Sequence, residues 1–261
     1  TLTRHGLHSI CQEARCPNMA ECFQDGTAVF LLMGDVCTRN CRYCNVKHGV
    51  PGPVDPGEIP RLVAAVEYLN LKYAVLTSVT RDDLPDGGAA VFANAVTSLR
   101  AALPAIRIEV LIPDFQGRQE DLEKVIASGP AVVNHNIEVA LPFYSRLRPL
   151  GNYRTSLDLL ARVSQAGLVS KSGFMVGFGE EKDDVIKLLR DLAGASCRRV
   201  TIGQYQQPTR RHWPVARYYH PDEFAAFREM ALALGFEHVE ADPLVRSSYR
   251  AARGGIGKQP S

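Results

Sequence analysis

The 261-residue sequence has no long apolar run and no large excess of either charge. No hydrophobic stretch approaches the roughly 20 residues that span a bilayer, so we expect a soluble chain with no membrane partner. Lys and Arg outnumber Asp and Glu by 30 to 28, and a net charge of +2 gives no argument for a nucleic-acid partner. The chain starts at Thr1 without a signal-peptide pattern. We therefore expect a cytoplasmic protein, or an organellar one if a targeting peptide precedes Thr1.

Six apolar, β-branched runs alternate with segments of helical periodicity, as in parallel βαβ units. The predicted strands span residues 28–35, 73–79, 107–113, 131–139, 170–178 and 199–205, and the predicted helices span 58–71, 87–103, 119–128, 155–167, 182–194 and 221–235. Because parallel crossovers are right-handed, six such units predict an α/β fold, a partial (βα)6 TIM-like barrel. We expect residues 1–27 to form a Cys-rich cap, residues 28–240 the barrel, and residues 241–261 a C-terminal extension that is flexible from Ala251.

Six of the seven cysteines form two triads: Cys11, Cys16 and Cys22, and Cys37, Cys41 and Cys44. A disulfide framework pairs its cysteines, whereas a triad leaves one over. Structural zinc needs a fourth ligand, which His48 is near enough in sequence to supply to the second triad. Three soft thiolates fit an iron–sulfur cluster better, with one iron left open to a substrate. Cys197 belongs to neither triad, and we expect it to be a buried structural thiol.

The second triad, in "CTRNCRYC", resembles the signature of the radical S-adenosylmethionine (radical SAM) superfamily, with the aromatic Tyr43 before the last cysteine. The stretch "GFMVGFGE", residues 173–180, resembles a glycine-rich strand pattern of the same superfamily, with Met175 in place of Ile. The resemblance implies a 4Fe–4S cluster whose open iron binds S-adenosylmethionine. The pair then yields a 5′-deoxyadenosyl radical that removes hydrogen from an unactivated carbon.

The first triad placed before the second is similar to the arrangement of the lipoyl synthase family, and the similarity extends over nearly the whole chain. It is carried by "CPNMAEC", "TSVTRDDLPDGGA", "NHNIE", "GQYQQP" and "PLVRSSYRA", with Arg250 as a departure where many members have His. The resemblance implies an enzyme that inserts two sulfur atoms at carbons 6 and 8 of a protein-bound octanoyl-lysine. It also implies a second 4Fe–4S cluster, consumed as the sulfur source and held by Cys11, Cys16, Cys22 and a serine, with Ser248 favoured over Ser247.

By the same resemblance, polar residues at the strand ends are candidates for contacts with S-adenosylmethionine. Tyr43 is assigned to the adenine and Thr77 and Ser78 to the methionyl group; the remaining polar groups are assigned to Asn134, Asn136 and Glu180. Asp82, Asp83 and Asp86 are better explained as a capped turn before the helix that starts near Gly87. His135 could act as a base, which radical chemistry does not require.

A basic cluster near the C-terminal end is predicted to dock an acidic carrier protein, because opposite charges speed encounter. Its members are Arg210, Arg211, His212, Trp213, Arg246, Arg250 and Arg253. The expected partners are an octanoylated lipoyl carrier domain, of a glycine cleavage H protein or of a 2-oxoacid dehydrogenase acyltransferase subunit, and an electron donor such as flavodoxin or ferredoxin. The alternatives are another two-cluster radical SAM enzyme that inserts sulfur, a ferredoxin-like electron carrier, and a zinc-stabilised binding module.

Overall fold

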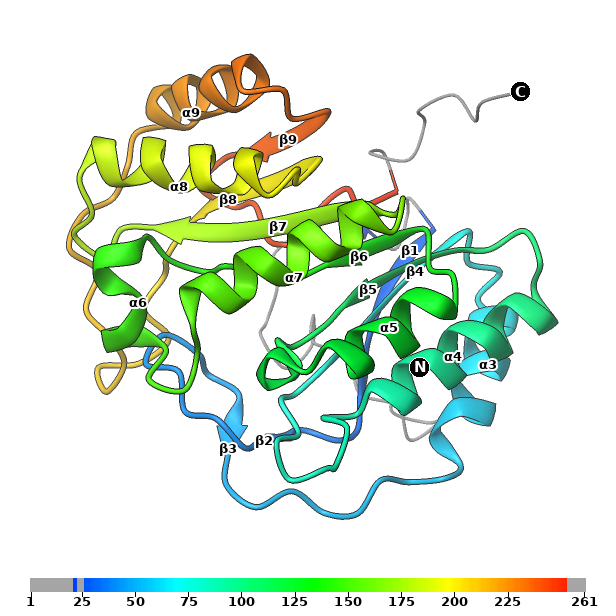
Figure 1. Ribbon diagram of the computed structural model, residues 1–261. Helices are drawn as coiled ribbons and strands as arrows, with labels where there is room; N and C mark the ends of the chain where they lie inside the picture. Colours follow the sequence, from blue (N-terminus) through cyan, green and yellow to red (C-terminus); the bar gives the residue numbers. More distant parts are fainter. Residues whose placement is uncertain (1–20, 23–25, 253–261) are drawn as a thin grey trace.

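The structure, a computed structural model, describes residues 21–22 and 26–252. Within them, seven strands form one sheet in the order β1-β4-β5-β6-β7-β8-β9, and each strand pairs in parallel with the next. Figure 1 shows the helices packed over one face of this curved sheet. The fold is therefore the partial TIM-like barrel that the sequence predicts, with one strand more than expected. In the described part of the chain, no helix combines the length and the apolar character needed to cross a bilayer.

The strands and helices follow the predicted alternation. The strands are β1 (Thr27–Leu32), β2 (Val36–Cys37), β3 (Lys47–His48), β4 (Tyr73–Ser78), β5 (Arg107–Leu111), β6 (Val132–Asn134), β7 (Val169–Val176), β8 (Arg199–Gln204) and β9 (His238–Ala241). The helices are α3 (Glu58–Tyr68), α4 (Ala89–Ala102), η2 (Phe115–Gly117), α5 (Gln119–Ala127), α6 (Leu141–Leu147), α7 (Tyr153–Gln165), α8 (Lys182–Gly194) and α9 (Pro221–Ala233).

Helix α8 illustrates how the sequence specifies these elements. Glu181 and Asp184 form a reciprocal capping box that satisfies the first backbone N–H groups of the helix. The buried side chains of α8 recur at the spacing of one helical face: Val185, Leu188, Leu189 and Leu192.

Alternate residues of β4 separate the two sides of the sheet. Ala74 and Leu76 belong to the large core cluster formed with the helices, whereas Tyr73 and Val75 pack with Ala251 of the C-terminal segment. Because side chains alternate along a strand, Tyr73 and Val75 face the interior of the barrel. The C-terminal segment therefore lies against that interior.

The C-terminal segment, residues 242–252, contacts both halves of the open barrel. At one side Asp242 N donates to the carbonyl of Ile202 in β8, and a Cβ on Gly203 would clash with the Val245 carbonyl. At the other side Ala251 is buried against β1 and β4. The expectation of a flexible tail starting at Ala251 is therefore wrong for that residue, because its methyl group is packed; residues 253–261 lie outside the described part.

The observed strands end earlier than several of the predicted runs, most of all 131–139, and one strand was not predicted. The run 131–139 pairs regularly only over β6, and the chain then returns to β7 through a single bridge between Glu138 and Phe174, where Glu138 has a left-handed φ of 73°. Strand β9 was not predicted, because its four residues bury only Val239 and contain no apolar run. Strands β6 and β9 are short and pair with neighbouring strands that are distant in sequence, so local sequence patterns do not fix their bounds.

Candidate active site

The second cysteine triad lies on one short loop that follows β1. Cys37 ends β2, which pairs with β3, and Gly49 N donates to the Cys37 carbonyl at 2.9 Å. Within the loop, Cys44 N donates to the Cys41 carbonyl at 3.0 Å. All three cysteine side chains are half-buried. The loop is thus closed at its base and presents three thiols near the carboxyl ends of the strands.

Arg39, between the first two cysteines of this loop, fastens the loop to the barrel. Its Nη1 and Nη2 donate to the two carboxylate oxygens of Asp114, each at 2.7 Å, and its Nε donates to Asp82 at 2.6 Å. Arg39 and Asp114 are 7% and 4% exposed. Asp82 follows β4 and Asp114 follows β5, so one guanidinium ties the cysteine loop to two strand ends. The turn predicted from the three aspartates holds for Asp86, which accepts from Gly88 N and Ala90 N.

In the absence of a metal, the surroundings of Cys41 and Cys44 disfavour the deprotonated thiolate form. Burial raises the pKa of Cys41 and raises the pKa of Cys44 to about 12, and repulsion among the cysteines adds to both shifts. Among residues 21–22 and 26–252, no three His, Cys, Asp or Glu side chains converge as a ready-made ligand group. Metal binding deprotonates thiols, and thiolates are the ligands of iron–sulfur clusters. The donor chemistry of this loop therefore fits an iron–sulfur cluster held by three cysteines.

Two charged residues beside the loop, Glu138 and Arg148, were missed by the sequence analysis. Arg148 is 9% exposed, and its Nη1 donates to the carbonyls of Asn136 and Ile137 at 3.1 and 3.3 Å. Burial raises the pKa of Glu138, and the charge of Arg148 opposes that shift. Glu138 could have been found as the acid that ends "NHNIE"; Arg148 follows a helix that was not predicted.

The loop after β7 is organised by Glu180, a predicted cofactor contact. Its carboxylate accepts from Gly177 N at 2.7 Å and from Phe178 N at 2.9 Å, and the side chain is buried. Phe178 stacks on Tyr205 with ring centroids 4.3 Å apart and meets Tyr43 edge-on at 6.3 Å. Glu180 thus fixes the loop of Phe178, whose buried ring packs against Tyr205 and Tyr43.

Several predicted cofactor contacts carry buried polar atoms without a protein partner. Within the described residues these atoms are Ser78 Oγ, Asn134 Oδ1 and Asn136 Oδ1. Asn136 Oδ1 lies where a Cβ on Gly173 would come within 2.9 Å, so the glycine of β7 leaves room for it. Buried polar groups normally find hydrogen-bond partners, so these orphan atoms fit a polar ligand. Thr77, in contrast, already donates to the Leu111 carbonyl at 3.1 Å.

The Asn134 amide nitrogen and two other side chains considered in the sequence, His135 and Cys197, have structural roles. Asn134 Nδ2 donates to Glu109, which also accepts from Tyr73 and Lys171 in a buried network inside the barrel. His135 Nδ1 donates to the Ile112 carbonyl and its Nε2 forms a hydrogen bond with Ser156. Burial lowers its pKa to about 4, so it is a neutral histidine near pH 7. Cys197 is buried, as predicted, and burial raises its pKa to about 12.

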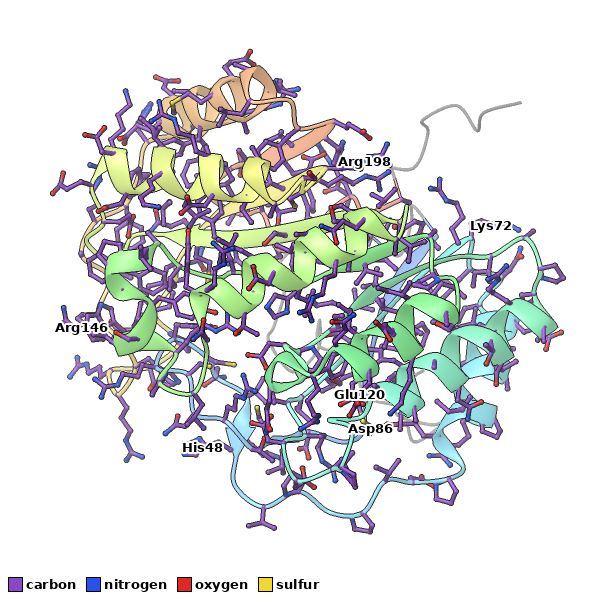
Figure 2. The ribbon with its side chains drawn as sticks, viewed as in Figure 1. His48, Lys72, Asp86, Glu120, Arg146 and Arg198 are labelled. Carbon is purple, nitrogen blue, oxygen red and sulfur yellow. The ribbon has the colours of Figure 1, made fainter. Side chains whose placement is uncertain are left out.

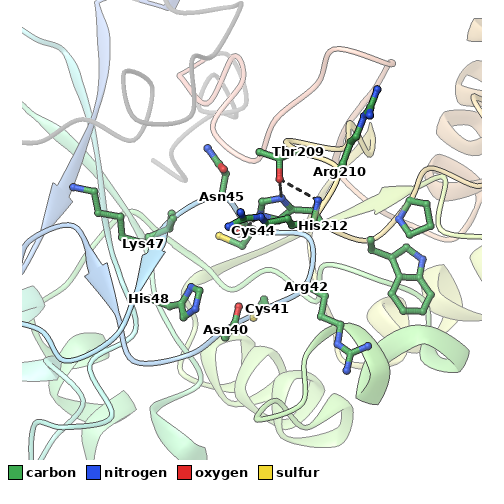
Figure 3. Close-up of a pocket in the computed structure, with 14 residues that line it drawn as sticks. Asn40, Cys41, Arg42, Cys44, Asn45, Lys47, His48, Thr209, Arg210 and His212 are labelled. Carbon is green, nitrogen blue, oxygen red and sulfur yellow. Dashed lines mark hydrogen bonds between the residues drawn. The ribbon is translucent and has the colours of Figure 1, made fainter.

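A cavity of about 890 Å³ lies between the cysteine loop and the segment 209–214 (Figure 3). Cys41 and Cys44 line it, and His212 Nε2 lies 3.0 Å from the Cys44 carbonyl. In Figure 2, His48 and Arg146 lie at this end of the molecule, and Lys72 and Arg198 lie at the opposite end of the barrel. The exposed cations on the cavity wall are Arg42, Lys47, Arg210 and Arg211. Four of the seven members of the predicted docking cluster are therefore beside the cysteine loop: Arg210, Arg211, His212 and Trp213.

Arg246 and Arg250 of that cluster lie in or beside the serine motif, which Glu21 of the N-terminal segment contacts. Tyr249 OH donates to Glu21 Oε2 at 3.1 Å, and Arg250 Nε donates to Glu21 Oε1 at 3.1 Å. Cys22, Ser247 and Ser248 are half-buried. Cys11, Cys16 and Arg253 lie outside the described residues. The contact brings the segment that carries Cys22 to the motif that carries both serines.

The family model described as the Radical SAM superfamily matches residues 31–192. Solved structures share the fold at low sequence identity. Methylornithine synthase aligns with a TM-score of 0.59 and 13% identity over 82% of this chain and 70% of that chain. Streptococcus suis SuiB bound to S-adenosylmethionine aligns with a TM-score of 0.62 and 11% identity over 85% of this chain and 51% of that chain. The fold and the cysteine loop thus define a radical SAM enzyme, and this superfamily implies S-adenosylmethionine and one 4Fe–4S cluster as cofactors.

Curated relatives narrow the family. The lipoyl synthase of Nitratidesulfovibrio vulgaris (strain Hildenborough) is 54% identical over 246 residues, 94% of this chain and 83% of that protein. The lipoyl synthase of Caldicellulosiruptor bescii is 52% identical over 253 residues, 96% of this chain and 87% of that protein. The chain belongs to the lipoyl synthase family.

Proposed function

We propose that this protein inserts two sulfur atoms, at carbons 6 and 8, into an octanoyl chain carried on a lysine of a lipoyl carrier domain. Carbons 6 and 8 are saturated, with no acidic proton and no leaving group, so acid–base and nucleophilic catalysis offer no route. S-adenosylmethionine bound at the first 4Fe–4S cluster supplies a 5′-deoxyadenosyl radical that abstracts hydrogen. Cys11, Cys16, Cys22 and Ser248 would hold a second 4Fe–4S cluster, which would be the source of the sulfur.

The contact between Glu21 and the pair Tyr249 and Arg250 is the observation that carries this proposal. A radical SAM barrel alone is compatible with many reactions. A second cysteine segment that meets the serine motif supports a second cluster with three thiolates and one oxygen ligand. Oxygen is a harder ligand than sulfur and is more easily displaced from iron, which suits a cluster that gives up atoms.

The residues of the barrel would serve the first cluster. Cys37, Cys41 and Cys44 would hold it, and Arg39 keeps their loop on the strand ends. The orphan oxygens of Ser78, Asn134 and Asn136 are available to donors on the cofactor, and the half-buried Tyr43, which packs against Phe178, is assigned to its adenine.

The basic wall of the cavity is assigned to protein partners. Arg210 and Arg211 are exposed beside the cysteine loop, which suits an acidic carrier domain such as a glycine cleavage H protein or an acyltransferase subunit. A flavodoxin or ferredoxin would supply the electron for each cleavage of S-adenosylmethionine. Such partners place the enzyme in the cytoplasm or in an organelle.

Anaerobic incubation with an octanoyl-lysyl peptide, a reductant and S-adenosylmethionine tests the proposal. Mass analysis should show two sulfur atoms gained, with one 5′-deoxyadenosine and one methionine released for each hydrogen removed. Sulfur gain on a different substrate, with none on the octanoyl peptide, would favour another sulfur-inserting radical SAM enzyme.

A further inference from the structure

The carboxylate of Glu21 accepts hydrogen bonds from two side chains near the C-terminal end of the sequence. Tyr249 OH lies 3.1 Å from Oε2 and 3.4 Å from Oε1, and Arg250 Nε lies 3.1 Å from Oε1. The Arg250 guanidinium also lies over the Tyr249 ring, 4.8 Å from its centroid. The two side chains therefore converge on one carboxylate from adjacent positions in the chain.

The C-terminal side of this contact is fixed to the barrel. Tyr249 N donates to the Arg246 carbonyl, and Ala251 N donates to the Ser248 carbonyl. Ala251 is buried against Val29 and Tyr73 on the inner face of the barrel. A residue that binds Tyr249 and Arg250 is thereby held at a set place relative to the strands.

The residues next to the contact are the proposed ligands of the second cluster. Cys22 follows Glu21 directly, and Ser248 precedes Tyr249 directly. We infer that Glu21 is a positioning residue: its contact with Tyr249 and Arg250 holds the segment of Cys22 against the serine motif, so that the serine reaches the fourth iron. The inference rests on the proposed function, because it requires that second cluster.

The chemistry of the contact explains why a carboxylate stands at position 21. It accepts from a phenol and from a guanidinium at once, and the hydrogen bond with the guanidinium is charge-assisted. Gln would keep an acceptor for Tyr249 but lose the charge. The side chains of Glu21 and Arg250 are 39% and 35% exposed, so solvent weakens the pair and a graded effect is expected rather than loss of the fold.

The test uses the full chain with Cys37, Cys41 and Cys44 replaced by Ala, which leaves only the proposed second cluster. After anaerobic loading with iron and sulfide, we expect about four irons per chain. The protein is then exposed to ferricyanide and EDTA, and the electron paramagnetic resonance signal of a three-iron cluster is followed with time. Glu21→Ala should lose the fourth iron roughly threefold to tenfold faster than the parent, as expected for one charge-assisted contact. Ser248→Ala should show the same signal at least as fast, and Glu21→Gln should fall between.

Two further variants separate positioning from general destabilisation. Exchange of the pair, Glu21→Arg with Arg250→Glu, should restore at least half of the lost protection. Glu237→Ala removes a similarly exposed ion pair, with Arg198 at 2.6 Å, and should leave the rate unchanged. Equal rates for the parent, Glu21→Ala and Glu21→Gln would overturn the inference while leaving the second cluster intact. A parent that binds no iron would overturn the proposed function, and the inference with it.

Discussion

The guanidinium of Arg39 and the carboxylate of Asp114 form a two-point pair, with Nη1–Oδ2 and Nη2–Oδ1 both at 2.7 Å. Arg39 belongs to the cysteine loop and Asp114 to the loop after β5, so the pair connects the cysteine loop to the sheet. It is also almost fully buried. Its loss should therefore affect both folding and cluster binding.

Asp114→Ala should lower the free energy of unfolding by about 3 kcal/mol or more, because it leaves Arg39 buried with one carboxylate fewer. Urea unfolding followed by circular dichroism measures this change. Iron incorporation at the first cluster should also fall. Asp158→Ala, which removes an exposed pair with Arg154, is the control and should cost less than about 0.5 kcal/mol. Equal costs for the two variants would show that Arg39 does not depend on Asp114.

His135 predicts a dependence of stability on pH. Burial lowers its pKa from 6.5 to about 4, and the positive charge of Arg148 contributes to the same shift. The unfolded chain then binds more protons than the folded one between these values, so stability is lost as pH falls from about 6.5 towards about 4. The loss should reach about 3 kcal/mol by linkage.

Urea unfolding of the wild type and of His135→Gln at a series of pH values tests this account. The difference in unfolding free energy between the two should change across that window and stay level above it. Parallel curves would mean that another group titrates. Gln can still hydrogen-bond to Ser156, so the variant removes the charge change with little change of packing.

Asn136 and Thr77 should respond differently to truncation, although the sequence suggests both as cofactor contacts. Asn136→Ala removes an oxygen that no described group satisfies, so we expect weaker binding of S-adenosylmethionine, roughly tenfold. The Asn136 side chain also hydrogen-bonds Glu138, so about 1 kcal/mol of stability should be lost as well. Thr77→Val removes the donor to Leu111 and should cost about 1 kcal/mol of stability with a smaller effect on affinity. Isothermal titration and thermal unfolding of both variants measure the two quantities. The reverse pattern would exclude Asn136 as a contact.

Much of this arrangement could be predicted from the sequence because it depends on local patterns. Buried β-branched runs gave the positions of β1, β4, β5, β7 and β8, and the cysteine spacing gave the loop after β1. Pairings between distant residues have no such pattern. Nothing near Arg39 predicts Asp114 as its partner, and Glu21 and Arg250 are 229 residues apart in the sequence. Arg148 was missed for the same reason, because only the folded chain brings it beside the cysteine loop.

The exposed arginines beside the cysteine loop predict how the carrier protein binds. Arg210→Glu with Arg211→Glu should lower kcat/KM on a whole octanoylated carrier domain roughly tenfold, because the charges that steer association are reversed. Turnover of a short octanoyl-lysyl peptide should be spared, and the effect should shrink at high salt. Arg154→Glu, on the exposed face of α7, serves as the control. Equal losses on peptide and carrier would count against docking at this surface.

In the proposed function, a second 4Fe–4S cluster held by the cysteine segment before β1 supplies the sulfur, and Cys22→Ala tests this most directly. The measurement is the mass of an octanoyl-lysyl peptide after anaerobic incubation with reductant and S-adenosylmethionine, with 5′-deoxyadenosine determined in the same sample. We predict that the variant still forms 5′-deoxyadenosine but that the peptide gains no sulfur, whereas the wild type adds two sulfur atoms. A Cys22→Ala enzyme that adds both sulfur atoms at the wild-type rate would contradict the account.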